Sequence, residues 1–161
     1  MLQFELTAAN ATLEEFKPKM KKDEGGKIPC AELVFSVPLD AEVLAFFSPK
    51  LRDFIFNEDS LDLAGGMPLR DPYMSLPMHR EEEMGGADVK VGFGLKQVLA
   101  FESVSLDEFS LTPMAGSVVI VKFRVKCQPT ESQAGALYML QEQPITLTVS
   151  PPDSESMLEA A

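Results

Sequence analysis

The stretch from residue 116 to residue 129, GSVVIVKFRVKCQP, has the most regular pattern in the chain. Its odd positions from 119 to 127 are apolar, and its even positions from 122 to 126 are basic: Lys122, Arg124 and Lys126. Successive side chains of a β-strand point to opposite faces of the sheet, so a period of two indicates a strand with one buried face. We therefore expect a strand over residues 117–127, with its basic side chains on an exposed sheet face.

Similar apolar patterns predict the rest of a mainly β fold. The other expected strands are 2–9, 28–38, 87–95, 98–112 and 143–150. The segment 98–112 is expected as two pieces, with a bulge or corner near Val104. Residues 113–116 form the expected hairpin turn. Two short helical pieces are expected within 40–56, with Ser48 and Pro49 opening the second. A helix is expected over 130–142, where Thr130 and Gln133 suit a capping box, and Ala134, Leu137, Tyr138 and Gln141 share one face. The predicted fold class is a β-rich, mainly antiparallel barrel or sandwich with two or three short helices.

The chain of 161 residues is long enough for one domain, which we place at 1–150. Within it, residues 57–86 are rich in Gly, Pro and Met and have no sustained period, so they form a long irregular insertion. The sequence leaves open whether this insertion is a mobile arm, a partner-binding loop or a set of short strands. Residues 151–161 form an expected flexible acidic tail.

The overall charge excludes a generally basic, DNA-coating protein. The formal net charge is -11, with 25 acidic and 14 basic residues. No apolar run approaches the roughly 20 residues that span a bilayer, and the N-terminus has no secretory pattern. Cys30 and Cys127 fit a reduced pair, which predicts a protein of a cytoplasm, bacterial or host.

We expect no enzymatic activity, no cofactor and no metal site. The single histidine, His79, adjoins the acidic run Glu81–Glu83, but the spacing matches no common metal motif. We expect both cysteines to be small residues within strands rather than catalytic nucleophiles. Paired carboxylates, such as Glu102 with Asp107 or Glu108, remain an open alternative because a sequence gives no geometry.

The predicted binding site is a basic surface for single-stranded DNA. Alternate residues of a strand are about 6.5 to 7 Å apart, close to the phosphate spacing of an extended nucleic acid, which suits Lys122, Arg124 and Lys126. A lysine-rich loop between the first two strands is expected to close over them: Lys17, Lys19, Lys21 and Lys22. The alternative is an ordinary solvated sheet face, favoured by the lack of Trp for base stacking.

Three stretches give the chain a family resemblance: GGADVKVGFG, SVVIVKFRVKCQP and QEQPITLTVSPP, together with the opening FELTAAN. In these strand patterns the chain resembles small bacteriophage and prophage early-region proteins. The resemblance implies a gene located among those for DNA recombination and replication. It implies no functional residue.

We therefore expect a non-enzymatic binding protein of a phage or mobile element. The most specific expectation is an accessory single-stranded DNA-binding protein, whose acidic residues 153–159 recruit partners or screen the basic groove. An acidic inhibitor of a host defence or nucleic-acid-handling protein is the alternative, and a virion structural or assembly protein is the third. A homodimer formed through the 57–86 arm is also left open, and no membrane partner is expected.

Overall fold

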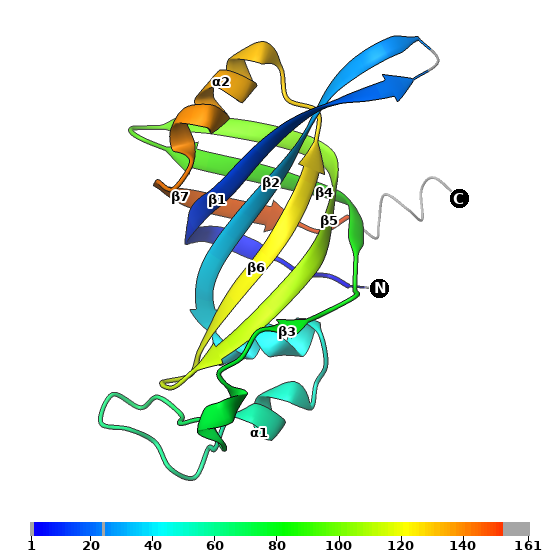
Figure 1. Cartoon of the computed structure of the whole chain (residues 1–161). Helices are drawn as coiled ribbons and strands as arrows, with labels where there is room; N and C mark the ends of the chain where they lie inside the picture. The colour runs from blue at the N-terminus through cyan, green and yellow to red at the C-terminus, as the bar shows by residue number, and fades with distance from the viewer. Residues whose placement is uncertain (1, 24, 153–161) are drawn as a thin grey trace.

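A computed structural model describes residues 2–23 and 25–152, which form an antiparallel β-barrel (Figure 1). The sheet contains these strands: β1 (Leu6–Asp23), β2 (Gly26–Asp40), β3 (Met78–His79), β4 (Met84–Phe93), β5 (Gln97–Met114), β6 (Val118–Cys127) and β7 (Pro144–Ser150). The neighbours run β5-β4-β7-β1-β2-β6, and β6 pairs again with β5, which closes the ring. The short β3 pairs with β5 at Leu111 and Ser110. The predicted β-rich antiparallel fold is confirmed.

The period-two pattern of β6 has the predicted structural meaning. Val119, Val121, Phe123 and Val125 are buried in the barrel, whereas Lys122 and Lys126 are exposed on its outer surface. β6 lies between β2 and β5, so both of its edges are paired. Closing the sheet in this way leaves β6 without an open edge of the kind that favours aggregation.

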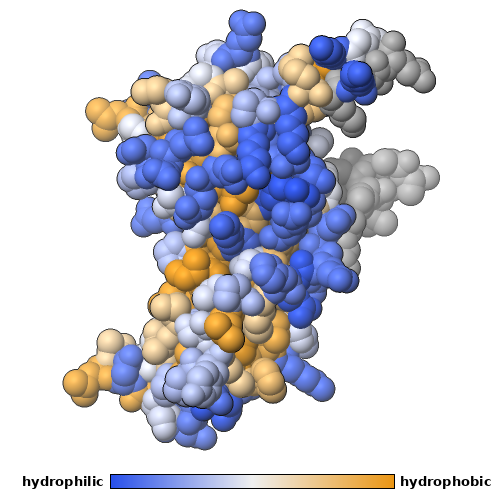
Figure 2. Space-filling model, in the orientation of Figure 1, coloured by the Kyte–Doolittle hydropathy of each residue, from blue (hydrophilic) through white to orange (hydrophobic). Residues whose placement is uncertain are grey.

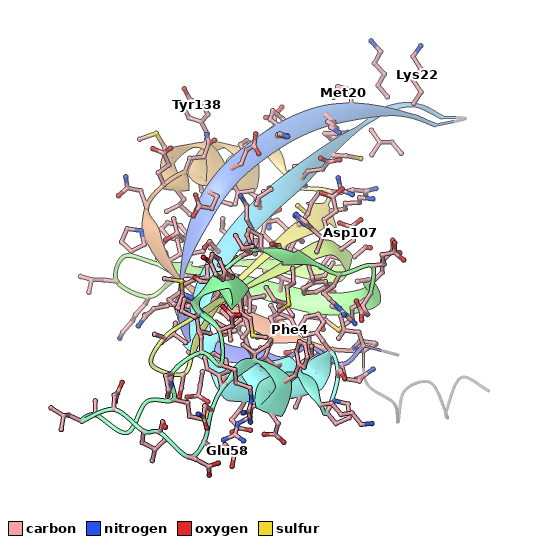
Figure 3. The ribbon with its side chains drawn as sticks, turned by 60° about the horizontal axis from the view of Figure 1, so that its bottom comes forward. Phe4, Met20, Lys22, Glu58, Asp107 and Tyr138 are labelled. Carbon is pink, nitrogen blue, oxygen red and sulfur yellow. The ribbon has the colours of Figure 1, made fainter. Side chains whose placement is uncertain are left out.

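A cluster of phenylalanine rings packs around Phe4 in the core. Phe4 is fully buried, with ring centroids 5.3 Å from Phe109, 5.4 Å from Phe123 and 5.8 Å from Phe46. The side-chain view places Phe4 within the body of the molecule (Figure 3). Phe46 ends the short helix η1 (Ala41–Phe46), which is followed by α1 (Leu51–Ile55). These elements confirm the two predicted helical pieces, although α1 begins at Leu51 rather than at Ser48.

The predicted loop between the first two strands is wrong, because that segment is a long β-hairpin. β1 and β2 pair continuously from Lys17↔Glu32 to Asp23↔Gly26. β7 pairs with β1 only up to Thr12, and β6 pairs with β2 only from Ala31 onward, so the hairpin extends beyond the barrel (Figure 1). Both faces of this part contact solvent, which explains why its sequence lacks the alternation of a half-buried strand.

The predicted irregular insertion contains little regular structure until Met84, where β4 begins. Its regular pieces are η2 (Pro72–Met74) and β3. The insertion is attached to the β5–β6 turn: the carbonyl of Met67 accepts hydrogen bonds from the amides of Gly116 and Ser117, at 2.9 and 3.1 Å. It therefore packs on one end of the barrel, with Met67 and Met84 buried.

The remaining predictions have mixed outcomes. The bulge near Val104 is confirmed, since the β4–β5 register shifts between Val104 and Phe101. The capping box of α2 (Glu131–Leu140) is also confirmed, because the Thr130 and Gln133 side chains each accept a hydrogen bond from the other's backbone amide. The predicted apolar face of this helix is partly wrong: Leu137 is buried, but Tyr138 is 67% exposed.

Two expectations concern the ends of the chain and the membrane. The predicted acidic tail, except Pro151 and Pro152, lies outside the described residues. Within the described ranges, no helix has the length and apolar character needed to cross a bilayer.

Candidate binding face and its charge network

The predicted basic residues lie on the outer face of β6, between β2 and β5. Lys122 is opposite Ser36 on one side and Ser110 on the other, and Arg124 is opposite Val34 and Asp107. Lys126 is opposite Glu32 and Ser105. The register therefore places acidic side chains from both neighbouring strands beside the basic ones.

Arg124 is held by a carboxylate from β5. Its Nε donates a hydrogen bond to Oδ1 of Asp107 at 2.8 Å, and its Nη2 donates to Oδ2 at 2.9 Å. Such two-point pairing fixes the guanidinium more strongly than a single contact does. The Nζ of Lys126 lies 3.1 Å from Oδ2 of the same carboxylate. Asp107 is only 5% exposed, so this pairing takes place largely away from water.

Two further acids approach the same group of bases. Glu108 lies 3.3 Å and Glu32 lies 3.7 Å from Nη1 of Arg124, and Glu32 also accepts a 2.8 Å hydrogen bond from Lys19 on the hairpin. We call these six side chains the charge network: Lys19, Glu32, Asp107, Glu108, Arg124 and Lys126. Three formal positive charges meet three negative charges, so the network has no net charge.

The ion pairs of the charge network shift the pKa values of Asp107, Glu32 and Arg124. The hydrogen bonds from Arg124 hold the pKa of Asp107 below its usual range, with a smaller contribution from Lys126, and burial opposes the shift. The pKa of Glu32 is lowered chiefly by the hydrogen bond from Lys19. The Arg124 pKa is raised, mainly by Asp107. Both carboxylates are therefore ionised at neutral pH and neutralise the neighbouring bases.

The lysines of the hairpin do not form the predicted cover over β6. Lys19 is joined to the network through Glu32, whereas Lys17 lies 3.4 Å from Glu15. Lys22 is exposed near the tip of the hairpin, far from Asp107 in Figure 3. The backbone of Lys21 lies in β1, and its side chain is outside the described part of the structure. Of the predicted basic cluster, the fold thus brings Lys19 together with Arg124 and Lys126.

A groove of about 770 Å³ lies between the base of the hairpin, the bulged part of β5 and the end of β6. Lys19 and Lys126 line it, but so do Glu32 and Glu102. Phe101 also lines it, yet that ring is buried. Among described aromatic residues, the exposed ones lie elsewhere: Phe46, Phe54, Tyr73 and Tyr138. The groove therefore has neither a positive excess nor an open ring on which a base can stack.

The residues considered for catalysis are dispersed. His79 is exposed on β3, and the neighbouring Arg80 forms an ion pair with Glu82 whose hydrogen bond lowers the Glu82 pKa. In residues 2–23 and 25–152, no three His, Cys, Asp or Glu side chains are placed to hold a metal ion. Asp107 is occupied by Arg124, so it does not form a free carboxylate pair with Glu102.

The two cysteines differ in environment. Cys127 is buried, and this burial raises its pKa to about 12, with a smaller effect from Cys30. Cys30 is partly exposed and lines the groove. A thiol with a raised pKa is a poor nucleophile at neutral pH, so Cys127 has a structural role.

Sequence reasoning named Asp107 and Glu108 only as possible members of a carboxylate pair and missed their contacts with Arg124. Asp107 and Glu108 follow a bulged segment, and β5 shifts register against β6 between Asp107 and Ser110. The alternation of β6 predicts which side chains point outward, but it does not reveal the residues opposite them. Comparisons of the chain with protein-family models, curated proteins and solved structures find no match.

Proposed function

We propose that this chain is a non-enzymatic binding protein of a mobile genetic element, and that it binds a basic protein of the bacterial cytoplasm. The observation that carries the proposal is the two-point pairing of Arg124 with Asp107. It neutralises the centre of the basic face of β6, on a chain whose formal net charge is -11. Because the remaining field is acidic, it attracts basic partners and repels nucleic acid.

Such a protein would act as an acidic inhibitor of a nucleic-acid-handling protein. A protein that binds nucleic acid has a basic surface, and an acidic competitor can occupy that surface through charge complementarity. Occupation alone is enough for inhibition, so the proposed function requires no catalytic group. The dispersal of His79 and the two cysteines is compatible with this role.

Single-stranded DNA is the second candidate, and one observation favours it. Lys122 is exposed, and no carboxylate of the described residues lies within ion-pair distance of it. The exposed Lys22 and Lys27 pair with each other near the hairpin tip and add positive charge there, whereas Lys122 lies opposite Ser36 in the barrel sheet. Against this candidate, the groove contains as many acidic as basic side chains.

The test of the proposed function is affinity isolation from bacterial host extract treated with nuclease, followed by reconstitution with the purified captured protein. We expect a basic protein that forms a stoichiometric complex at 0.1 M salt, weakens at about 0.5 M salt and loses nucleic-acid binding when the chain is added. Failure to reconstitute any complex would overturn the proposal. Tight binding of a labelled oligo-dT by the chain itself would instead favour the second candidate.

A further inference from the structure

The described exposed apolar side chains gather at one end of the molecule. We call residues 41–77 the end lobe; in Figure 1 it lies below the barrel. Of twelve exposed large apolar residues in the described part of the chain, seven belong to this lobe or to the adjacent β5 end: Phe46, Phe54, Leu61, Leu63, Tyr73, Leu76 and Met114. Met114 reaches the lobe through a 3.4 Å hydrogen bond from the Ser75 hydroxyl to its sulfur. Exposed apolar groups concentrated in this way mark an interaction surface.

The outermost part of the lobe is the loop 57–66, which projects away from the barrel (Figure 1). Leu61 and Leu63 lie on it, and Leu63 is fully exposed. Figure 2 shows a hydrophobic tip at this projection, next to hydrophilic atoms. An apolar side chain held at the end of a projection is suited to insertion into a pocket of another protein.

Hydrogen bonds fix the shape of this loop. The Asp62 carboxylate accepts from the amides of Ala64 and Gly66, at 2.9 and 2.7 Å, and the Asp62 amide donates to the Gly66 carbonyl at 2.8 Å. Gly66 packs against Gly116 so closely that an added Cβ would lie 2.7 Å from the Gly116 Cα. A loop already held in one conformation loses little entropy when it binds.

The charge of the loop selects the kind of partner. Residues 57–66 include Glu58, Asp59 and Asp62 but no Lys or Arg. Glu58 is paired with Arg52 of α1 at 2.6 Å, so Asp59 and Asp62 carry the loop charge that is left for a partner. Acidic groups beside apolar ones match a pocket with basic side chains around its rim. A second copy of this chain would bring acid against acid at a net charge of -11 for each copy, which opposes self-association.

We propose that the loop 57–66 is the docking element for the protein partner, with Leu61 and Leu63 entering an apolar pocket rimmed by basic side chains. This inference rests on the proposed function and adds to it the surface and the chemistry of the site on the partner. The hairpin and the β6 face are then not required for the contact.

Site-specific photocross-linking tests whether the partner contacts the loop 57–66. A benzoylphenylalanine is placed at position 63, and a matched control is placed at position 95, where the exposed Leu95 lies in the β4–β5 turn far from the lobe. Both chains are expressed in bacterial host cells and irradiated. We expect one discrete adduct with a basic protein from position 63 and none from position 95. An adduct with the mass of two copies, or an adduct from position 95 alone, would overturn the inference.

Measuring the affinity for the purified partner tests whether Leu61 and Leu63 contribute to binding. Leu61→Asp/Leu63→Asp should reduce affinity by about 30-fold or more, the effect typical of losing a hot-spot side chain, whereas Leu95→Asp should leave it unchanged. Equal thermal unfolding of the variants establishes that they remain folded. If the partner binds the Leu61→Asp/Leu63→Asp chain as tightly as wild type, the docking inference is wrong although the proposed function stands. If no partner binds the wild-type chain, both are wrong.

Discussion

The guanidinium of Arg124 and the carboxylate of Asp107 face each other across neighbouring strands and share two hydrogen bonds of 2.8 and 2.9 Å. The predicted nucleic-acid site depends on a free Arg124, and this pairing removes that freedom. The basic stripe of β6 is therefore neutralised at Arg124 and Lys126 in the folded chain, whereas Lys122 stays exposed. This pairing supports our proposal of a basic protein partner in place of nucleic acid.

Removing the Asp107 charge should destabilise the fold. Asp107→Asn leaves Arg124 and Lys126 without their nearest carboxylate in a largely buried site, and we expect a loss of about 1 to 3 kcal/mol in the free energy of unfolding. Urea unfolding measures the change. Glu108→Gln is the control, because Glu108 is well exposed and its ion pair should contribute about 1 kcal/mol or less. Equal effects of the two substitutions would contradict the account.

Acid should remove the contribution of Asp107. Its pKa is lower in the folded chain than in the unfolded chain, where it is about 4. The stabilisation is therefore fully present above about pH 4 and is lost as the pH falls through the folded-state pKa. We expect the difference in unfolding free energy between wild type and Asp107→Asn to shrink between about pH 4 and pH 2. A difference that stays constant over this range would refute the assignment, and comparing the two chains removes the effect of Glu82, which lies outside the charge network.

The phenylalanine cluster should be the most sensitive part of the core. Phe4→Ala removes a fully buried ring that packs on Phe109 and Phe123, so we expect a loss of about 3 to 5 kcal/mol in the free energy of unfolding. Phe54→Ala is the matched control, because Phe54 is 65% exposed and its removal should cost about 0.5 kcal/mol or less. Equilibrium unfolding in urea compares the two, and a small effect of Phe4→Ala would show that the N-terminal segment is not part of the core.

Two glycine substitutions should act in opposite directions. Gly66→Ala forces a methyl group against the Gly116 backbone and should destabilise the chain by about 1 to 3 kcal/mol. Gly135→Ala lies in α2 with open space around the added methyl group, and it should stabilise by about 0.5 to 1 kcal/mol. Thermal unfolding of both variants tests the packing of the lobe on the β5–β6 turn. A neutral Gly66→Ala would indicate that the two segments are not in close contact.

The cysteines should differ in reactivity. Because burial raises the Cys127 pKa to about 12, this thiol is protonated and shielded at pH 8. We expect iodoacetamide to alkylate Cys30 in the folded chain and to reach Cys127 only after denaturation, as measured by mass spectrometry of peptides. Alkylation of both at similar rates under folding conditions would place Cys127 nearer the surface than the structure does.

Features of the fold that depend on neighbours in sequence could be predicted, whereas contacts between residues far apart in sequence could not. The pattern of β6, the capping box at Thr130 and the bulge near Val104 depend on neighbours in sequence, and all three are confirmed. The projecting hairpin has the sequence pattern of a loop because neither of its faces is buried against the barrel. Ion pairs such as Arg124–Asp107 depend on the register between β5 and β6. A bulge in β5 changes this register, and the sequence of β6 does not reveal the change.

The central claim is that acidic side chains occupy the basic face, and fluorescence anisotropy with a labelled oligo-dT at low salt tests it most directly. The account predicts no binding by the wild-type chain, and a gain of salt-sensitive binding by Asp107→Asn/Glu108→Gln, in which Arg124 and Lys126 are released. Micromolar binding by the wild-type chain that is lost in Lys122→Glu/Arg124→Glu/Lys126→Glu would contradict the claim and assign the face to single-stranded DNA.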